Sequence, residues 1–68
     1  MLKEYFEDFY GFTYSLLHRP NGNVLLTARF PHGGLYLSKV YSTERGARIA
    51  LGRISEGTAR LKGKEMLA

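Results

Sequence analysis

Residues 18–50 carry the sequence HRPNGNVLLTARFPHGGLYLSKVYSTERGARIA. Apolar-rich runs of strand length flank Pro20-Asn21-Gly22 and then Pro31-His32-Gly33-Gly34. Proline fixes φ at an early turn position, and glycine adopts the positive φ that a tight hairpin loop needs. The segment therefore predicts two successive hairpins, and with them a three-stranded antiparallel sheet.

Helical periodicity begins after Ser42 and Thr43, either of which can cap a helix because its side-chain oxygen accepts an orphan N–H. The expected fold is α+β, with the three-stranded antiparallel sheet packed against one C-terminal helix that ends near Gly57 or continues to Lys62. One helix covers a single face of the sheet, so the other face is expected to stay open. The residues at helical spacing are Ala47, Ala50, Leu51, Ile54, Thr58 and Leu61.

The N-terminal residues admit two interpretations. Leu2, Tyr5, Phe6 and Phe9 stand at i, i+3, i+4 and i+7, which favours a short amphipathic helix closed by Gly11. The same aromatic residues also suit a strand. We therefore expect an acidic aromatic leader at 1–11, a sheet-plus-helix domain at 12–62 and a flexible tail at 63–68, with no internal repeat or linker.

Alternation along the predicted strands separates two faces. The core face holds Phe12, Tyr14, Leu16, Val24, Leu26, Ala28 and Phe30, and the open face holds Thr13, Ser15, Leu17, Arg19, Leu25, Thr27 and Arg29. A register slip of one residue would exchange the two sets, so the partition supports this pairing. Pairing Phe30 with Leu35 would add Leu35, Leu37 and Lys39 to the core face, and Tyr36, Ser38 and Val40 to the open face.

Composition limits the class of protein. A chain of 68 residues is one domain, and the absence of cysteine excludes disulfides and thiolate metal sites. No apolar stretch reaches the ~18 residues of a membrane span, and no signal-peptide pattern is present. We expect a soluble cytoplasmic protein that contacts no membrane.

The charge is uneven. Residues 1–11 hold Lys3 against Glu4, Glu7 and Asp8, a net of −2, whereas residues 12–68 hold nine Lys or Arg against three Glu, a net of +6. A basic body favours a polyanionic partner, although a merely soluble basic protein has the same composition.

The turn and helix landmarks resemble the ethylene-response-factor (Apetala-type) DNA-binding domain, whose relatives include arm-site modules of phage-type integrases. The resemblance covers Arg19 to Leu51 and depends on Arg19-Pro20-x-Gly22, Arg29-x-Pro31, Gly33-Gly34, Thr43, Ala47 and Ala50. It implies a three-stranded sheet that enters the DNA major groove, with one helix behind it. Arg19 and Arg29 match family positions that touch DNA, and the alignment points Leu35 and Leu37 outward, against the pairing derived above.

These observations predict a small non-enzymatic DNA-binding module, encoded by a phage or mobile element, that contacts duplex DNA through its open sheet face. The alternative is a small inhibitor or adaptor that binds a host protein through exposed aromatic residues and free strand edges. Neither histidine has a catalytic setting, no phosphate-binding glycine loop occurs, and no cofactor or metal is expected. The pattern specifies no oligomeric state. The candidate nucleic-acid-binding residues are Arg19, Thr27, Arg29, Tyr36, Ser38, Arg45 and Arg48.

Overall fold

Three hairpins of the same type connect the first four strands. In the computed structural model, which describes residues 1–68, β1 (Leu2–Glu7), β2 (Thr13–His18), β3 (Val24–Arg29) and β4 (Leu35–Tyr41) begin at residues 2, 13, 24 and 35. Each strand therefore starts 11 residues after the one before it. The chain thus contains a repeated strand-and-loop unit, and the expectation of no internal repeat is wrong.

The three hairpin loops share one hydrogen-bond pattern. The N–H of Asp8, Arg19 and Phe30 donates to the carbonyl four residues later, at 2.9, 2.8 and 2.8 Å. The last residue of each loop, Gly11, Gly22 or Gly33, has φ between 89° and 98°, a conformation that glycine adopts without strain. The two predicted hairpins are confirmed, and an unpredicted third precedes them.

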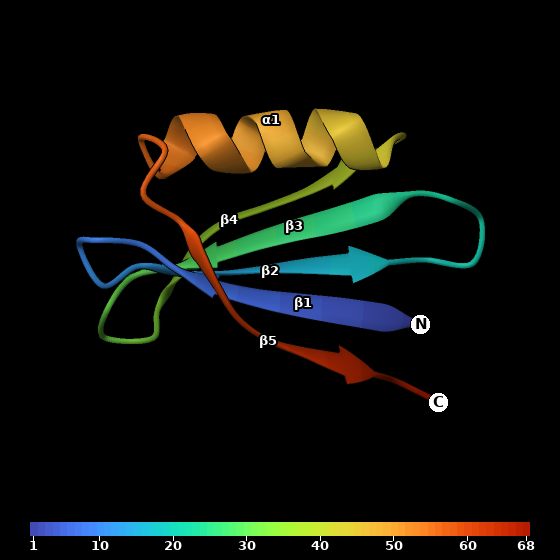
Figure 1. The fold of residues 1–68 in the computed structure, drawn as a ribbon, viewed down its shortest axis with the longest axis horizontal. Helices are drawn as coiled ribbons and strands as arrows, with labels where there is room; N and C mark the ends of the chain where they lie inside the picture. Colours follow the sequence, from blue (N-terminus) through green and yellow to red (C-terminus); the bar gives the residue numbers. More distant parts are fainter.

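The sheet has five antiparallel strands rather than the three expected. Their order is β4-β3-β2-β1-β5, because β5 (Arg60–Met66) returns beside β1 (Figure 1). The short helix expected within residues 1–11 is wrong, since β1 pairs along its length with both β2 and β5. Most of the expected tail at 63–68 belongs to β5, and the Met1 ammonium donates to Leu67 O at 2.7 Å beside it.

The helix α1 (Glu44–Ile54) lies over one face of the sheet and links its two edge strands (Figure 1). Thr43 caps it, as predicted, by accepting the Gly46 N–H at 3.1 Å. Gly57 N–H donates to Gly52 O at 2.8 Å and Glu56 N–H donates to Arg53 O at 3.3 Å, the two bonds of a Schellman turn, in which Glu56 takes the left-handed position with φ 54°. The helix therefore ends close to Gly57, and the chain leaves it toward β5. No helix of this protein is long and apolar enough to cross a membrane.

The core lies between α1 and the sheet. The predicted partition of faces in β2 and β3 is confirmed, and Leu16, Leu26 and Ala28 are fully buried. The full set of buried apolar residues is Phe6, Tyr14, Leu16, Val24, Leu26, Ala28, Ala47 and Leu51.

The predicted pairing of Phe30 with Leu35 is wrong. Leu35 stands opposite Arg29, and Leu37 stands opposite Ala28, so Tyr36 is the extra residue of a bulge. Leu37 packs against the core as the hydrophobic pattern predicts, whereas Leu35 is 57% exposed as the resemblance implies. The bulge arises because the loop closes at Phe30 and Gly34, one residue before the expected pair.

Substitution of two neighbouring leucines, which lie on opposite faces of β3, tests the assignment of the core face and the open face. We expect Leu26→Ala to lower the free energy of unfolding by about 2–5 kcal/mol, because it leaves a cavity in the core. Leu25→Ala, on the open face, should cost about 1 kcal/mol or less. Urea unfolding followed by circular dichroism measures both changes. Equal losses would contradict the one-sided core.

Candidate nucleic-acid interface

The face of the sheet that α1 leaves uncovered carries three rows of side chains, defined by the strand register. The middle row crosses four strands through Tyr5, Ser15, Thr27 and Ser38, and we call it the hydroxyl row. Every member carries a hydroxyl group, and those of Ser15, Thr27 and Ser38 can donate to a phosphate oxygen or to a base edge, whereas that of Tyr5 donates to Glu65. The row therefore offers hydroxyl donors on β2, β3 and β4.

The two flanking rows differ in chemistry. On one side Glu7, Thr13 and Arg29 stand in register. On the other side the register aligns Lys3 with an apolar run of Leu17, Leu25 and Val40. The open face is thus polar and charged at the loop end that holds Arg29, and apolar at the opposite end of β3 and β4.

A groove of about 400 Å³ occupies the polar part of this face. Short side chains on β2 and β3 form its floor, while longer ones from β1, β3 and β5 rise around it. Three of these are cationic, namely Lys3, Arg29 and Lys62, and one, Glu7, is anionic. The groove is therefore lined by hydroxyl groups and by an excess of positive charge.

Local contacts hold the groove's long side chains. Arg29 donates from its guanidinium to Gly33 O at 3.1 Å, and Lys62 Nζ lies 3.9 Å from Glu7 Oε1. The Tyr5 hydroxyl donates to Glu65 Oε1 at 2.7 Å, and this hydrogen bond raises the pKa of Tyr5. Lys3 Nζ lies 5.1 Å from the centre of the Tyr5 ring. The cations are partly oriented by the fold before any ligand arrives.

The structure brings together three of the seven residues predicted from sequence. Thr27 and Ser38 are register partners, and Arg29 follows Thr27 on the same face. Arg19 lies at the far end of the β2–β3 hairpin, because it faces Asn23 across the turn. Six residues of strand, about 20 Å, separate its position from Thr13, the partner of Arg29.

The other three predicted residues lie away from the open face. Tyr36 was expected on it, but the bulge places its ring 5.7 Å from Phe12 and 5.1 Å from Phe30 (centroid distances) on the helix side. Arg45 and Arg48 belong to α1, on the opposite side of the sheet. Arg45 is exposed there.

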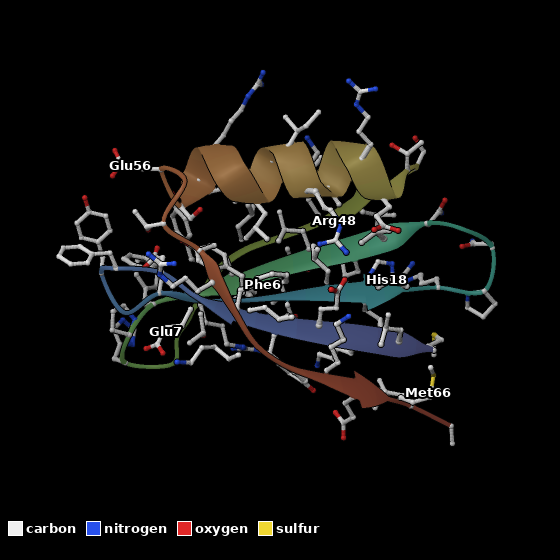
Figure 2. The ribbon with its side chains drawn as sticks, in the orientation of Figure 1. Phe6, Glu7, His18, Arg48, Glu56 and Met66 are labelled. Carbon is white, nitrogen blue, oxygen red and sulfur yellow. The ribbon has the colours of Figure 1, made fainter.

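Arg48 belongs to a polar cluster between α1 and the flank of the sheet (Figure 2). Its guanidinium donates to Glu4 Oε1 at 2.6 Å and to Glu44 Oε2 at 2.7 Å, and His18 Nε2 lies 2.7 Å from the same Glu4 oxygen. Burial acts to raise the pKa of Glu4, but the hydrogen bond from His18 and the charge of Arg48 outweigh it and lower that pKa. Arg48 is thus already neutralised by two carboxylates.

The acidic residues of the N-terminus are largely hidden. Glu4 is only 4% exposed and Asp8 only 8%. Asp8 Oδ1 accepts the N–H groups of Tyr10 and Phe12, at 2.8 and 3.0 Å, and Asp8 Oδ2 accepts the Tyr14 hydroxyl at 2.5 Å. Two of the three carboxylates of residues 1–11 therefore hold the fold together, and the expected acidic leader is not an acidic surface.

Sequence reasoning missed Lys3 and Tyr5, which line the groove together with Lys62. The first two were assigned to the favoured N-terminal helix, and Lys62 was placed at the possible end of α1 or in a basic tail. Gly11 was the available signal, because it precedes Gly22 by 11 residues just as Gly22 precedes Gly33. That spacing predicts a third hairpin, and hence a strand that contains Lys3 and Tyr5.

No protein-family model, curated protein or solved structure matches this chain. The arrangement of the residues themselves therefore carries the functional argument.

The two carboxylates bound to Arg48 give a matched test of the polar cluster. We expect Glu4→Gln to lower the free energy of unfolding by about 1–3 kcal/mol, because Glu4 is buried and hydrogen-bonded to charged groups. Glu44→Gln removes an exposed partner of the same guanidinium and should cost less than about 0.5 kcal/mol.

The pH dependence follows from the lowered pKa of Glu4. The contribution of ionised Glu4 to the free energy of unfolding is present above the pKa of the carboxyl group in the unfolded chain. It is lost as the pH falls through the lower pKa of Glu4 in the folded protein. The stability difference between wild type and Glu4→Gln should therefore shrink between about pH 7 and about pH 3. Urea unfolding at both pH values measures it, and a constant difference would contradict this role for Glu4.

Proposed function

We propose that this protein is a non-enzymatic DNA-binding module that contacts duplex DNA through the open face of its sheet. The observation that supports this most directly is the groove lined by hydroxyl groups and by Lys3, Arg29 and Lys62. Arginine and lysine bind phosphates and guanine edges, and hydroxyl groups bind phosphates and base edges. The groove offers both kinds of group on one surface.

The charge distribution supports a polyanionic partner. The chain has a formal net charge of +4, and two of its six carboxylates are buried in internal contacts. Long-range attraction to DNA depends on this net charge, and exposed cations release counterions when they neutralise phosphates. Burial leaves the charges of Glu4 and Asp8 in the net total, but it keeps both carboxylates out of direct contact with a phosphate backbone.

The width of the sheet limits how it can meet a duplex. Five strands at about 4.8 Å spacing span about 19 Å, which exceeds the ~12 Å width of the major groove. Strands β2, β3 and β4 together span only about 10 Å and carry Thr27, Arg29 and Ser38. In the proposed complex these three strands enter the groove, and Lys3 and Lys62 on β1 and β5 approach the phosphates beside it.

A matched pair of arginine variants tests the proposal. We expect Arg29→Ala to weaken binding to a random duplex and to lower the slope of log affinity against log salt concentration by about 1. Arg53→Ala removes the same charge from the exposed side of α1 and should change affinity far less. Fluorescence anisotropy with a random duplex and a random single strand, at two salt concentrations, measures these effects.

Equal losses in the two variants would contradict recognition by the open face. The absence of duplex binding at low salt would contradict the DNA-binding function itself. Stronger binding to the single strand would contradict the groove geometry while leaving a nucleic-acid partner in place.

A second candidate function is binding to another protein, and one exposed aromatic pair favours it. Phe9 is 81% exposed and Tyr10 is 57% exposed in the β1–β2 loop, with their rings 5.4 Å apart in an edge-to-face arrangement. The Phe9 N–H donates to Thr58 Oγ1 at 3.1 Å, which holds the loop against the segment after α1. Steep salt dependence of DNA binding separates the two functions, because burial of an aromatic pair releases no counterions.

A further inference from the structure

The two edges of the sheet differ in how they are protected. Strands β4 and β5 are the outermost strands. Four of the seven residues of β5 are charged, and its pairing with β1 contains a bulge. Strand β4 has a single charged residue, Lys39. Proteins protect exposed edges with charges and bulges, so β5 is guarded and the regular part of β4, after its own bulge at Tyr36, is not.

The regular part of β4, Leu37–Tyr41, carries little that would prevent pairing. It contains the exposed apolar residue Val40, a single charge at Lys39 and no proline. Strand β4 is hydrogen-bonded to β3 on one side and to no strand on the other, and the backbone of α1 lies near β2 and β3 as well as β4. A second strand therefore has access to its free backbone groups.

The ladder pattern identifies those groups. The bond from Arg19 N–H to Asn23 O marks a hydrogen-bonded pair, so β3 bonds to β2 at its odd-numbered residues and to β4 at its even-numbered ones. The even-numbered residues of β3 stand opposite the odd-numbered residues of β4 within Leu37–Tyr41. Ser38 and Val40 alternate with these and direct their N–H and C=O groups outward.

We propose that this edge pairs with the β4 edge of a second copy of the chain, antiparallel and centred on Ser38. In this register the two Ser38 residues exchange a pair of backbone hydrogen bonds across the two-fold axis. Each Lys39 then stands opposite Leu37 of the other copy rather than opposite its own equivalent. A register centred on Lys39 would place two like charges directly opposite each other, which is destabilising.

The pairing does not depend on DNA binding, but it has a consequence for the proposed function. Joining two β4 strands makes a sheet of ten strands, far wider than a major groove. Insertion of β2, β3 and β4 into DNA and pairing through β4 therefore exclude each other. If both hold, an excess of duplex converts the dimer to monomers.

A cysteine reporter tests the pairing directly, because the chain contains no cysteine. Residues of a hydrogen-bonded antiparallel pair have Cα atoms about 5.5 Å apart, within the range that a disulfide spans. We expect Ser38→Cys to form a disulfide-linked dimer under mild oxidation without any nucleic acid. Lys64→Cys, at an outward-facing position of β5, is the control and should form far less.

Two single proline variants test the same edge at equilibrium. Sedimentation velocity of the wild-type chain over a wide concentration range should show a reversible monomer–dimer transition. Ser38→Pro removes an outward N–H, which an edge strand tolerates, and should weaken the dimer about 10-fold or more. Lys64→Pro makes the same change on β5 and should leave the dimer intact, with circular dichroism confirming that both variants fold.

A wild-type chain that stays monomeric throughout, or Ser38→Cys that cross-links no faster than Lys64→Cys, would overturn the pairing. Neither result bears on DNA binding. Conversely, a dimer that persists unchanged in excess duplex would leave the pairing in place and count against groove insertion.

Discussion

A single helix faces a sheet of five strands. Because the helix is narrower than the sheet, it determines where the protein can build a core. An α-helix with its side chains is about 10–12 Å wide, whereas five strands span about 19 Å. Accordingly the backbone of α1 lies close to β2, β3 and β4 but not to β1 or β5. The apolar core is concentrated under the helix, and the flank of the sheet needs another kind of contact.

Arg48 supplies that contact. Its side chain extends from α1 toward the flank and meets Glu4 on β1 and, through Glu4, His18 on β2 (Figure 2). A buried carboxylate is tolerated only when its oxygens are satisfied, and the fold leaves no buried side-chain nitrogen or oxygen without a partner. The same need explains why a cation predicted to clamp phosphate is committed to the fold. From the sequence alone, Arg48 on a helix face is indistinguishable from a free surface arginine.

The central part of the fold could be predicted because local signals there agree. Turn residues, alternation and the Thr43 cap all indicate the same two hairpins and helix, and the open-face placement of Thr27 and Arg29 follows from them. A helix was favoured over a strand at the N-terminus because Glu4 breaks the apolar alternation of β1, and the partners of Glu4 are 14 and 44 residues away in sequence. Strand β5 has almost no apolar signal, since it lies at an edge beyond the reach of the helix.

The arrangement of edges and faces connects the two proposals. A small core leaves one face and two edges in contact with water, and charge distinguishes among them. Four charged residues protect β5, and cations border the groove on the open face, whereas Lys39 is the single charge of β4. Ser38 belongs to both surfaces, since its hydroxyl ends the hydroxyl row while its backbone lies at the centre of the open edge. Any partner that occupies the β4 edge therefore also changes access to the polar part of the open face.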